Sequence, residues 1–176
     1  MNFKIFKYDT VNSTNNVAID LIRKERKKNG LVHAKNQLKG RGTRGKLWIS
    51  EKGNFFGSIF FKLEDRYPSF NEFSIINPVI ISDIIKKFCK NKTVSIKWPN
   101  DILINKKKIC GILQEVITLN NKKFLIIGIG VNIVSHPKLN GKYKATNIFH
   151  ETKKKRSIKE LLGLIIKYYE NFFLNI

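Results

Sequence analysis

A loop rich in glycine and positive charge, residues 37–48, is the first part of the sequence whose residue types suggest chemistry. Its glycines are Gly40, Gly42 and Gly45, and its cations are Lys39, Arg41, Arg44 and Lys46. Glycines let backbone N–H groups approach an anion closely, and cationic side chains add donors for phosphate. The spacing also fits the dinucleotide fingerprint G-x-G-x-x-G, but that motif needs a helix to begin here, and a strand-like run follows instead. We expect an anion-binding loop, with a basic surface loop as the alternative.

Two further groups of polar residues stand at the ends of expected strands. Lys97-Trp98-Pro99-Asn100-Asp101 combines a cation, an aromatic ring, an amide and a carboxylate where a proline turns the chain. Lys108 follows a Lys106-Lys107 turn, and a hairpin there would return it toward Asp101. Gly128-Ile129-Gly130-Val131-Asn132 offers a close backbone approach and one amide side chain. We expect these strand ends to build one site.

Hydrophobic spacing predicts the elements that position these residues. A period near 3.6 predicts helices over 13–28, 73–90 and 157–173, the last opened by a Ser157-x-x-Glu160 capping box. Runs rich in Ile, Val, Leu and Phe predict strands over 31–35, 55–63, 94–98, 102–105, 109–119 and 123–133. Residues 136–151 show no clear period. The predicted fold class is α+β, a mixed sheet flanked by helices, in a single domain over residues 1–176.

Composition excludes several classes of protein. Hydrophobic residues make up 42% of the chain and charged residues 27%, which is typical of a globular domain. No apolar run is long enough for a membrane span or a signal peptide, so we expect a cytoplasmic protein that does not insert into membranes. Cys89 and Cys110, like the three histidines, lack the spacing of a metal site or a disulfide framework. Lys and Arg number 34 against 13 Asp and Glu, and this formal charge of +21 favours an anionic ligand or partner.

The order of the motifs resembles that of biotin protein ligases of the biotin-[acetyl-CoA-carboxylase] ligase type. The matching segments are Ser13-Thr14-Asn15, Gln37 with the glycine loop and Trp48, Lys97 to Asp101, Lys108 with Gly111, and Gly128 to Asn132. The resemblance implies the class II synthetase-like α+β catalytic domain of biotin and lipoate ligases. It also implies an enzyme that uses ATP and Mg²⁺ to convert biotin to biotinyl-5′-adenylate. Such an enzyme then transfers biotin to a lysine of a biotin carboxyl carrier protein, an acetyl-CoA carboxylase subunit.

The resemblance gives each matching residue an expected role. The catalytic residues would be Lys108, Arg41 and Lys97. The biotin-binding residues would be Ser13, Thr14, Asn15, Gln37, Gly111 and Lys108. The residues that bind ATP or the adenylate would be Gly40, Arg41, Gly42, Thr43, Arg44, Trp48, Asn100 and Asn132. Asp101 would support the metal ion or brace its own turn.

The chain also departs from the family pattern. Thr43 stands where the family usually has a second arginine, so we expect a weaker hold on the adenylate. The matching module begins by Ser13 and the chain ends with a helix, so we expect neither an N-terminal helix-turn-helix domain nor a C-terminal β-barrel domain. Direct DNA binding is therefore not expected, whereas a homodimer formed through sheet edges would be in keeping with the family.

Three alternatives remain open at this point. A lipoate or octanoate ligase or transferase has the same general fold and also transfers an acyl group to lysine. A nucleic-acid-binding module would account for the positive charge and the 11% of aromatic residues, and its affinity would fall steeply with salt. A degenerate relative would bind biotin without transferring it.

Overall fold

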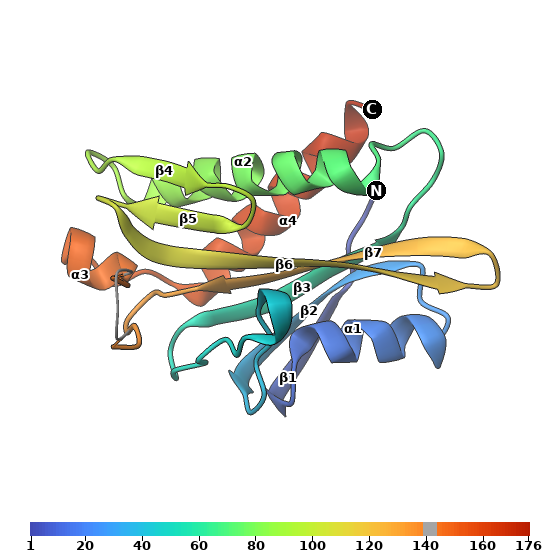
Figure 1. Ribbon diagram of the computed structural model, residues 1–176, viewed down its shortest axis with the longest axis horizontal. Coiled ribbons are helices and arrows are strands. Elements are labelled where there is room, and N and C mark those ends of the chain that lie inside the picture. The colour runs from blue at the N-terminus through green and yellow to red at the C-terminus, as the bar shows by residue number, and fades with distance from the viewer. Residues whose placement is uncertain (139–143) are drawn as a thin grey trace.

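A seven-stranded mixed sheet forms the centre of the computed structural model, which describes residues 1–138 and 144–176 (Figure 1). The strands are β1 (Ile5–Val11), β2 (Asn29–Gln37), β3 (Phe55–Lys62), β4 (Val94–Lys97), β5 (Asp101–Ile104), β6 (Lys107–Leu119) and β7 (Lys122–Val131). Their spatial order is β1-β2-β3-β7-β6-β5-β4. β1 and β2 are parallel, and all other neighbours are antiparallel. The expected α+β fold with a mixed sheet is confirmed.

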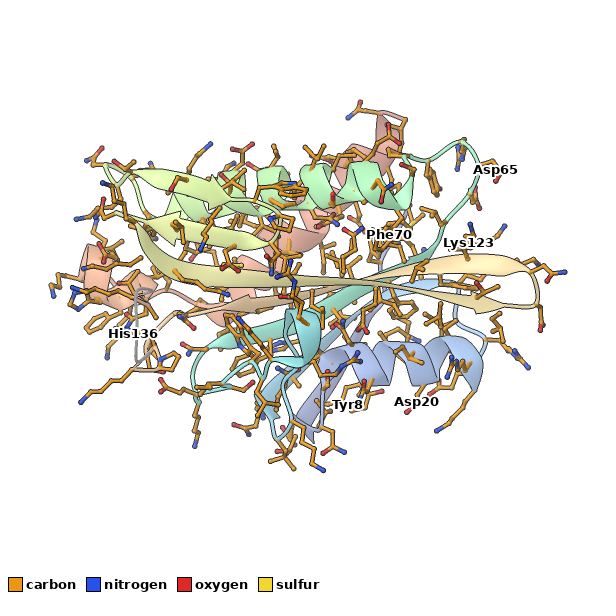
Figure 2. The ribbon with its side chains drawn as sticks, in the orientation of Figure 1. Tyr8, Asp20, Asp65, Phe70, Lys123 and His136 are labelled. Carbon is orange, nitrogen blue, oxygen red and sulfur yellow. The ribbon has the colours of Figure 1, made fainter. Side chains whose placement is uncertain are left out.

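Helices cover both faces of this sheet. α1 (Thr14–Arg23) packs on one face, where Phe60 and Ile126 belong to a smaller apolar core. α2 (Phe70–Phe88) and α4 (Ile158–Leu174) cover the opposite face, where the larger core includes Phe61 and Tyr169. Figure 1 shows α1 on one side of the sheet and α2 with α4 on the other, and Figure 2 shows the side chains that fill the two layers. None of the helices within the described residues is long and apolar enough to cross a membrane.

The helix ends differ in part from the expectation. α1 ends at Arg23 rather than at residue 28, because the following charged segment turns and Arg26 adopts a positive φ of 55°. α2 begins at Phe70 with a capping box between Ser69 and Glu72, and it continues through Pro78. The capping box expected at the start of α4 does not form, because the Ser157 hydroxyl accepts the Lys159 N–H instead.

Two elements were not expected from the sequence. β1 lies at the edge of the sheet, and most of its side chains are exposed or half-buried, so its hydrophobic signal is weak. α3 (Ile148–Thr152) is a single short helix in the segment without a clear period, and the Asn147 side chain caps it by accepting the His150 N–H. Neither element changes the fold class.

The β5–β6 hairpin brings Lys108 back toward Asp101, as the sequence predicted. Its turn is Asn105-Lys106, one residue earlier than expected, and both residues have positive φ values of 47° and 64°. The register shifts between Ile102 and Leu103, which places Gly111 opposite Asp101 and Lys108 opposite Leu103. Because two-residue turns with positive φ match the twist of a hairpin, this short connection fixes the position of Lys108 closely.

The sheet face beyond the first turn of α1 is lined by small residues. Ser58, Gly128 and Leu113 form one row across β3, β7 and β6, and Gly130 lies opposite Gly111 in a neighbouring row. Four of these five residues have little or no side chain, so they leave the sheet surface low under and beside the first turn of α1. This low floor is where a cleft forms.

Candidate active site

One cleft with a volume of about 600 Å³ gathers the motifs that the sequence singled out. It lies between the first turn of α1, the loop after β2, the β4–β5 turn and the glycine floor of β6 and β7. The predicted site residues that line it are Ser13, Thr14, Asn15, Gln37, Arg41, Gly42, Thr43, Arg44, Trp48, Lys97, Asn100, Asp101, Lys108 and Gly111. Gly40 and Asn132 are not among the lining residues. The expected convergence of strand ends is therefore confirmed for most of the set.

One end of the cleft is a network of neutral polar side chains at the start of α1, joined to the Glu115 carboxylate. Gln37 Oε1 accepts hydrogen bonds from the Thr14 N–H at 2.8 Å and from the Thr14 hydroxyl at 3.1 Å. The Ser58 hydroxyl lies 2.8 Å from Thr14 Oγ1 and donates to Asn15 Oδ1 at 2.5 Å. Asn15 Nδ2 donates to Glu115 Oε2 at 2.7 Å. Thr14, Asn15 and Ser58 are buried, so this array of donors and acceptors is held in fixed positions.

The other end of the cleft carries positive charge. Lys108 Nζ lies 2.7 Å from Asp101 Oδ1, and both side chains are largely shielded, with 26% and 19% of their surfaces exposed. Lys97 pairs with Asp101 across the β4–β5 ladder, so it also faces this end. The ion pair with the carboxylate holds Lys108 Nζ in one place, where a cationic side chain can also meet an anion. Asp101 is thus the ion-pair partner of Lys108 in this structure.

The glycine loop folds into a compact turn at the rim of the cleft. The Gly42 N–H donates to the Lys46 carbonyl at 2.7 Å, and the Trp48 N–H donates to the Gly40 carbonyl at 2.9 Å. Arg44 stands at the tip, in the short 3-10 turn η1 (Thr43–Gly45), with a positive φ of 55°. The loop therefore returns on itself and places Trp48 back over the sheet.

Trp48 lies directly on the glycine floor. A Cβ atom on Gly111 would come within 2.6 Å of its indole ring, and one on Gly130 within 2.5 Å, so only glycine fits under the ring. Lys108 Nζ lies 5.4 Å from the ring centroid, within the range of a cation–π interaction. The indole Nε1 is buried without a hydrogen-bond partner. Trp48 thus joins the cationic end of the cleft to its floor.

Arg41 lies nearer the neutral polar end than its expected role with phosphate suggested. Its Nη1 donates to Asn16 Oδ1 at 2.7 Å, and its Nη2 pairs with the Glu115 carboxylate. Thr43 accepts a hydrogen bond from Asn100 Nδ2 at 3.4 Å, which links the glycine loop to the β4–β5 turn. The loop is therefore held at both ends of the cleft.

Asn132 lies away from the cleft lining and is buried behind the strand end. Its Nδ2 donates to the Thr146 carbonyl at 3.0 Å, and its Oδ1 has no partner. Its expected role with ATP stays a prediction. Gly40 is also buried, because a Cβ there would come within 2.5 Å of the Trp48 carbonyl oxygen and 2.7 Å of Ser50 Oγ.

Two residues of the polar end were missed by sequence reasoning. Ser58 lies within the apolar run predicted as a strand over 55–63, where a hydroxyl signals a polar contact inside the core. Glu115 was hidden within a long strand, but it shares the cleft face of β6 with Gly111 and Leu113. A carboxylate on the same strand face as a required glycine was the available signal.

The described residues contain no group of three or more His, Cys, Asp or Glu side chains that could hold a metal ion. Asp101 is the only expected metal ligand, and its carboxylate already pairs with Lys108. Burial raises the pKa of Cys89 to about 11 and also raises the pKa of Cys110, so neither thiol is ionised near neutral pH. The charged groups available for chemistry are therefore the cations of the cleft.

Comparisons with known proteins agree with this geometry. Residues 8–132 match the model of the biotin/lipoate A/B protein ligase family. The bifunctional ligase/repressor BirA of Bacillus subtilis is 32% identical over 139 residues, which cover 78% of this chain and 42% of BirA. Biotin–protein ligase 2 of Arabidopsis thaliana is 33% identical over 147 residues, covering 78% of this chain and 43% of that protein. The chain thus spans about two fifths of the length of these curated relatives.

Solved structures show the same fold. The biotin protein ligase of Leishmania major in complex with biotinyl-5-AMP superposes with a TM-score of 0.75 and 29% identity, over 94% of this chain and 72% of that one. The biotin protein ligase of Aquifex aeolicus in complex with biotin and ATP gives a TM-score of 0.78 and 26% identity, over 96% and 69%. Because the family model matches well over half of the sequence, the chain belongs to the biotin/lipoate A/B protein ligase family.

Proposed function

We propose that this chain is a biotin protein ligase, which forms biotinyl-5′-adenylate from biotin and ATP and transfers biotin to a lysine of a carrier protein. The observation that carries the proposal is the division of one cleft into a neutral hydrogen-bonding end and a cationic end. Biotin has the same division, because its ureido ring is neutral and polar and its valeryl chain ends in a carboxylate. Sequence relatives that are named biotin ligases support the choice of biotin.

The neutral end is suited to the ureido ring. That ring presents two N–H donors and one carbonyl acceptor, which need fixed partners when they leave water. Thr14, Asn15 and Gln37 supply such partners, and the buried Ser58 holds two of them in place. In this proposal Ser13 and Gly111 complete the biotin subsite at the start of α1 and on the floor.

The cationic end is suited to joining two anions. The biotin carboxylate attacks the α-phosphorus of ATP, an O–P bond forms, and pyrophosphate leaves with the electrons of the broken P–O bond. Lys108 holds the carboxylate, while Lys97 offsets the charge that develops on the phosphates. Arg41 was expected to share this role, but it is paired with Glu115 and is not assigned to the phosphates here. Asp101 holds Lys108 Nζ in place through an ion pair of 2.7 Å.

The remaining loop residues would hold the adenylate after it forms. Gly42, Thr43 and Arg44 frame the phosphate side, and Asn100 supports that frame through Thr43. Gly40 lies behind the lining and accepts the Trp48 N–H, which helps to place Trp48 beside the adenine. A closed loop shields the mixed anhydride from water until an acceptor arrives. The lysine amine of the carrier then attacks the acyl carbon, the C–N bond forms, and AMP leaves.

Mg²⁺ enters this proposal with ATP as part of the substrate. Asp101 is already engaged by Lys108, and Mg²⁺ commonly binds substrate phosphates and keeps several waters rather than using a cage made by the protein. The ion would neutralise phosphate charge during the attack. Every other step in the proposal is assigned to side chains of this chain.

The implied partner is a biotin carboxyl carrier protein. The formal charge of +21 favours an acidic carrier surface, since opposite charges speed the encounter of two proteins. A homodimer formed through one of the two edge strands, β1 or β4, belongs to the same proposal. Direct DNA binding is not part of the proposal. We place the reaction in the cytoplasm, as the sequence led us to expect.

Lipoate and octanoate are the main competing substrates within the family. Both lack a ureido ring, so they would gain no hydrogen bonds from the polar array of Thr14, Asn15 and Gln37 and would place apolar surface against it. A nucleic-acid-binding module would need only a basic face, whereas the cations named here line a cleft whose other end holds buried polar side chains. These considerations favour the biotin ligase.

The test measures pyrophosphate release with biotin, ATP and Mg²⁺, followed by labelling of a carrier domain that bears an acceptor lysine. The Lys108→Gln variant should release pyrophosphate about 100-fold more slowly or worse, because it lacks the cation at the reacting carboxylate. Lys24→Gln is the matched control, since Lys24 forms only an exposed ion pair with Asp20 on α1. Equal rates for Lys108→Gln and the natural protein would refute the assigned role. No biotin-dependent release by the natural protein would refute the proposed function.

A further inference from the structure

We propose that Glu115 is a positioning residue for substrate recognition, and that it sets which end of the Asn15 carboxamide faces each neighbour. The inference deepens the proposed function and rests on it, because Asn15 belongs to the proposed biotin subsite. Glu115 itself need not touch the substrate, since it acts through the side chains that it holds.

The hydrogen bonds around Asn15 allow only one orientation of its amide. Asn15 Nδ2 donates to Glu115 Oε2 at 2.7 Å, and Asn15 Oδ1 accepts from the Ser58 hydroxyl at 2.5 Å. An ionised carboxylate can only accept hydrogen bonds, so the amide nitrogen must face Glu115. Rotation of the amide by half a turn would bring its oxygen against the carboxylate and would separate the Ser58 hydroxyl from its acceptor.

Packing prevents Asn15 from escaping this constraint. Only 3% of its surface is exposed, and it rests on Gly128, where an added Cβ would lie 3.0 Å from Asn15 Cγ. The Leu113 carbonyl is also within 3.4 Å of Asn15 Nδ2, which favours the same orientation. The polar pattern offered to a ligand is therefore determined by Glu115 and Ser58 rather than by Asn15 alone.

The second oxygen of Glu115 is used by the glycine loop. Glu115 Oε1 pairs with Arg41 Nη2, and Arg41 Nη1 donates to Asn16 Oδ1 at 2.7 Å. The arginine neutralises a carboxylate that would otherwise repel an anionic substrate from a shielded position, since only 22% of the Glu115 side chain is exposed. One carboxylate thus ties the start of α1 to the loop after β2.

Glu115→Gln is the most direct test, because it preserves size and removes the constraint. A glutamine amide can donate as well as accept, so both orientations of the Asn15 carboxamide become possible. We expect biotin affinity, measured by isothermal titration without ATP, to fall about tenfold or more. Asp83→Asn is the matched control, since Asp83 forms an exposed ion pair with Lys86 on α2. The control should bind biotin as the natural protein does.

A double-mutant cycle separates positioning from a general loss of structure. If Glu115 acts through Asn15, Glu115→Gln should weaken biotin binding less than twofold in a protein that already carries Asn15→Ala. The inference would be overturned if Glu115→Gln weakened biotin binding by the same factor with and without Asn15→Ala. Unchanged biotin affinity in Glu115→Gln alone would also overturn it. Thermal unfolding of every variant is recorded alongside, and a loss of affinity that only follows a loss of folded protein also overturns it. Failure of the natural protein to bind biotin would instead refute the proposed function, and this inference with it.

Discussion

Gly128→Ala should damage the neutral end of the cleft while leaving the fold intact. The added Cβ would lie 3.0 Å from Asn15 Cγ and 3.1 Å from Asn15 Nδ2. Carbon atoms in ordinary contact lie about 3.5–4.0 Å apart, so the carboxamide must move by roughly 0.5–1 Å. Its hydrogen bonds to Ser58 and Glu115, at 2.5 and 2.7 Å, would then be stretched or lost.

The size of the effect follows from those two hydrogen bonds. A hydrogen bond to a charged group contributes about 1.5–3 kcal/mol, and one between neutral groups about 1 kcal/mol. If about 2 kcal/mol of this is lost from ligand binding, biotin affinity falls roughly 30-fold, since each 1.4 kcal/mol is a factor of ten. The smaller apolar core contains neither Gly128 nor Asn15, so the substitution should leave that core in place.

The assay is isothermal titration of biotin into Gly128→Ala and into the control Gly163→Ala. Gly163 is on the exposed side of α4, and a Cβ there would meet no atom within 4 Å. The control should bind biotin normally and gain up to about 1 kcal/mol of stability from its better helix propensity. Biotin affinity within twofold of the natural protein in Gly128→Ala would refute the placement of Asn15 in the biotin subsite.

Three further predictions test other parts of the molecule. Gly130→Ala should displace the Trp48 ring, because three atoms of the ring would lie within 2.8 Å of the new Cβ. The KM for ATP should then rise at least fivefold in a pyrophosphate assay with saturating biotin. Thr43→Arg should release biotinyl-adenylate more slowly in a filter-binding chase, because a guanidinium adds charge-assisted hydrogen bonds to phosphate; equal release rates would contradict this. Burial lowers the pKa of His33, so the unfolded chain binds a proton that the folded one does not, and the free energy of unfolding should fall as the pH drops below about 6.5. In urea titrations, the free energy of unfolding should fall more between pH 7.5 and pH 5.5 for the natural protein than for His33→Gln.

The sequence predicted those parts of the fold whose signals are local. The break between the strands predicted over 109–119 and 123–133 was found because Asn120 and Asn121 there tolerate positive φ, and β3 and β7 were found because they are long apolar runs. β1 escaped because an edge strand buries few side chains, and α1 was placed too long because nothing local marked the turn near Arg26. These errors concern segments whose structure is decided by packing against distant residues.

The site shows the same division between local and distant causes. The motifs around Lys97 and Lys108 were placed correctly, because a short hairpin relates them. Ser58 and Glu115 join the site only because β7 lies between β3 and β6, which sets Ser58 beside Gly128 and Gly128 beside Leu113. That order depends on pairings across many residues of sequence, so no local pattern contains it.

The most direct measurement is mass spectrometry of the protein after incubation with ATP, Mg²⁺ and either biotin or lipoate. The proposed function predicts biotinyl-5′-adenylate and pyrophosphate with biotin, little or no adenylate with lipoate, and the loss of product in Lys108→Ala. The appearance of lipoyl-adenylate alone, or of no adenylate with either acid, would contradict it.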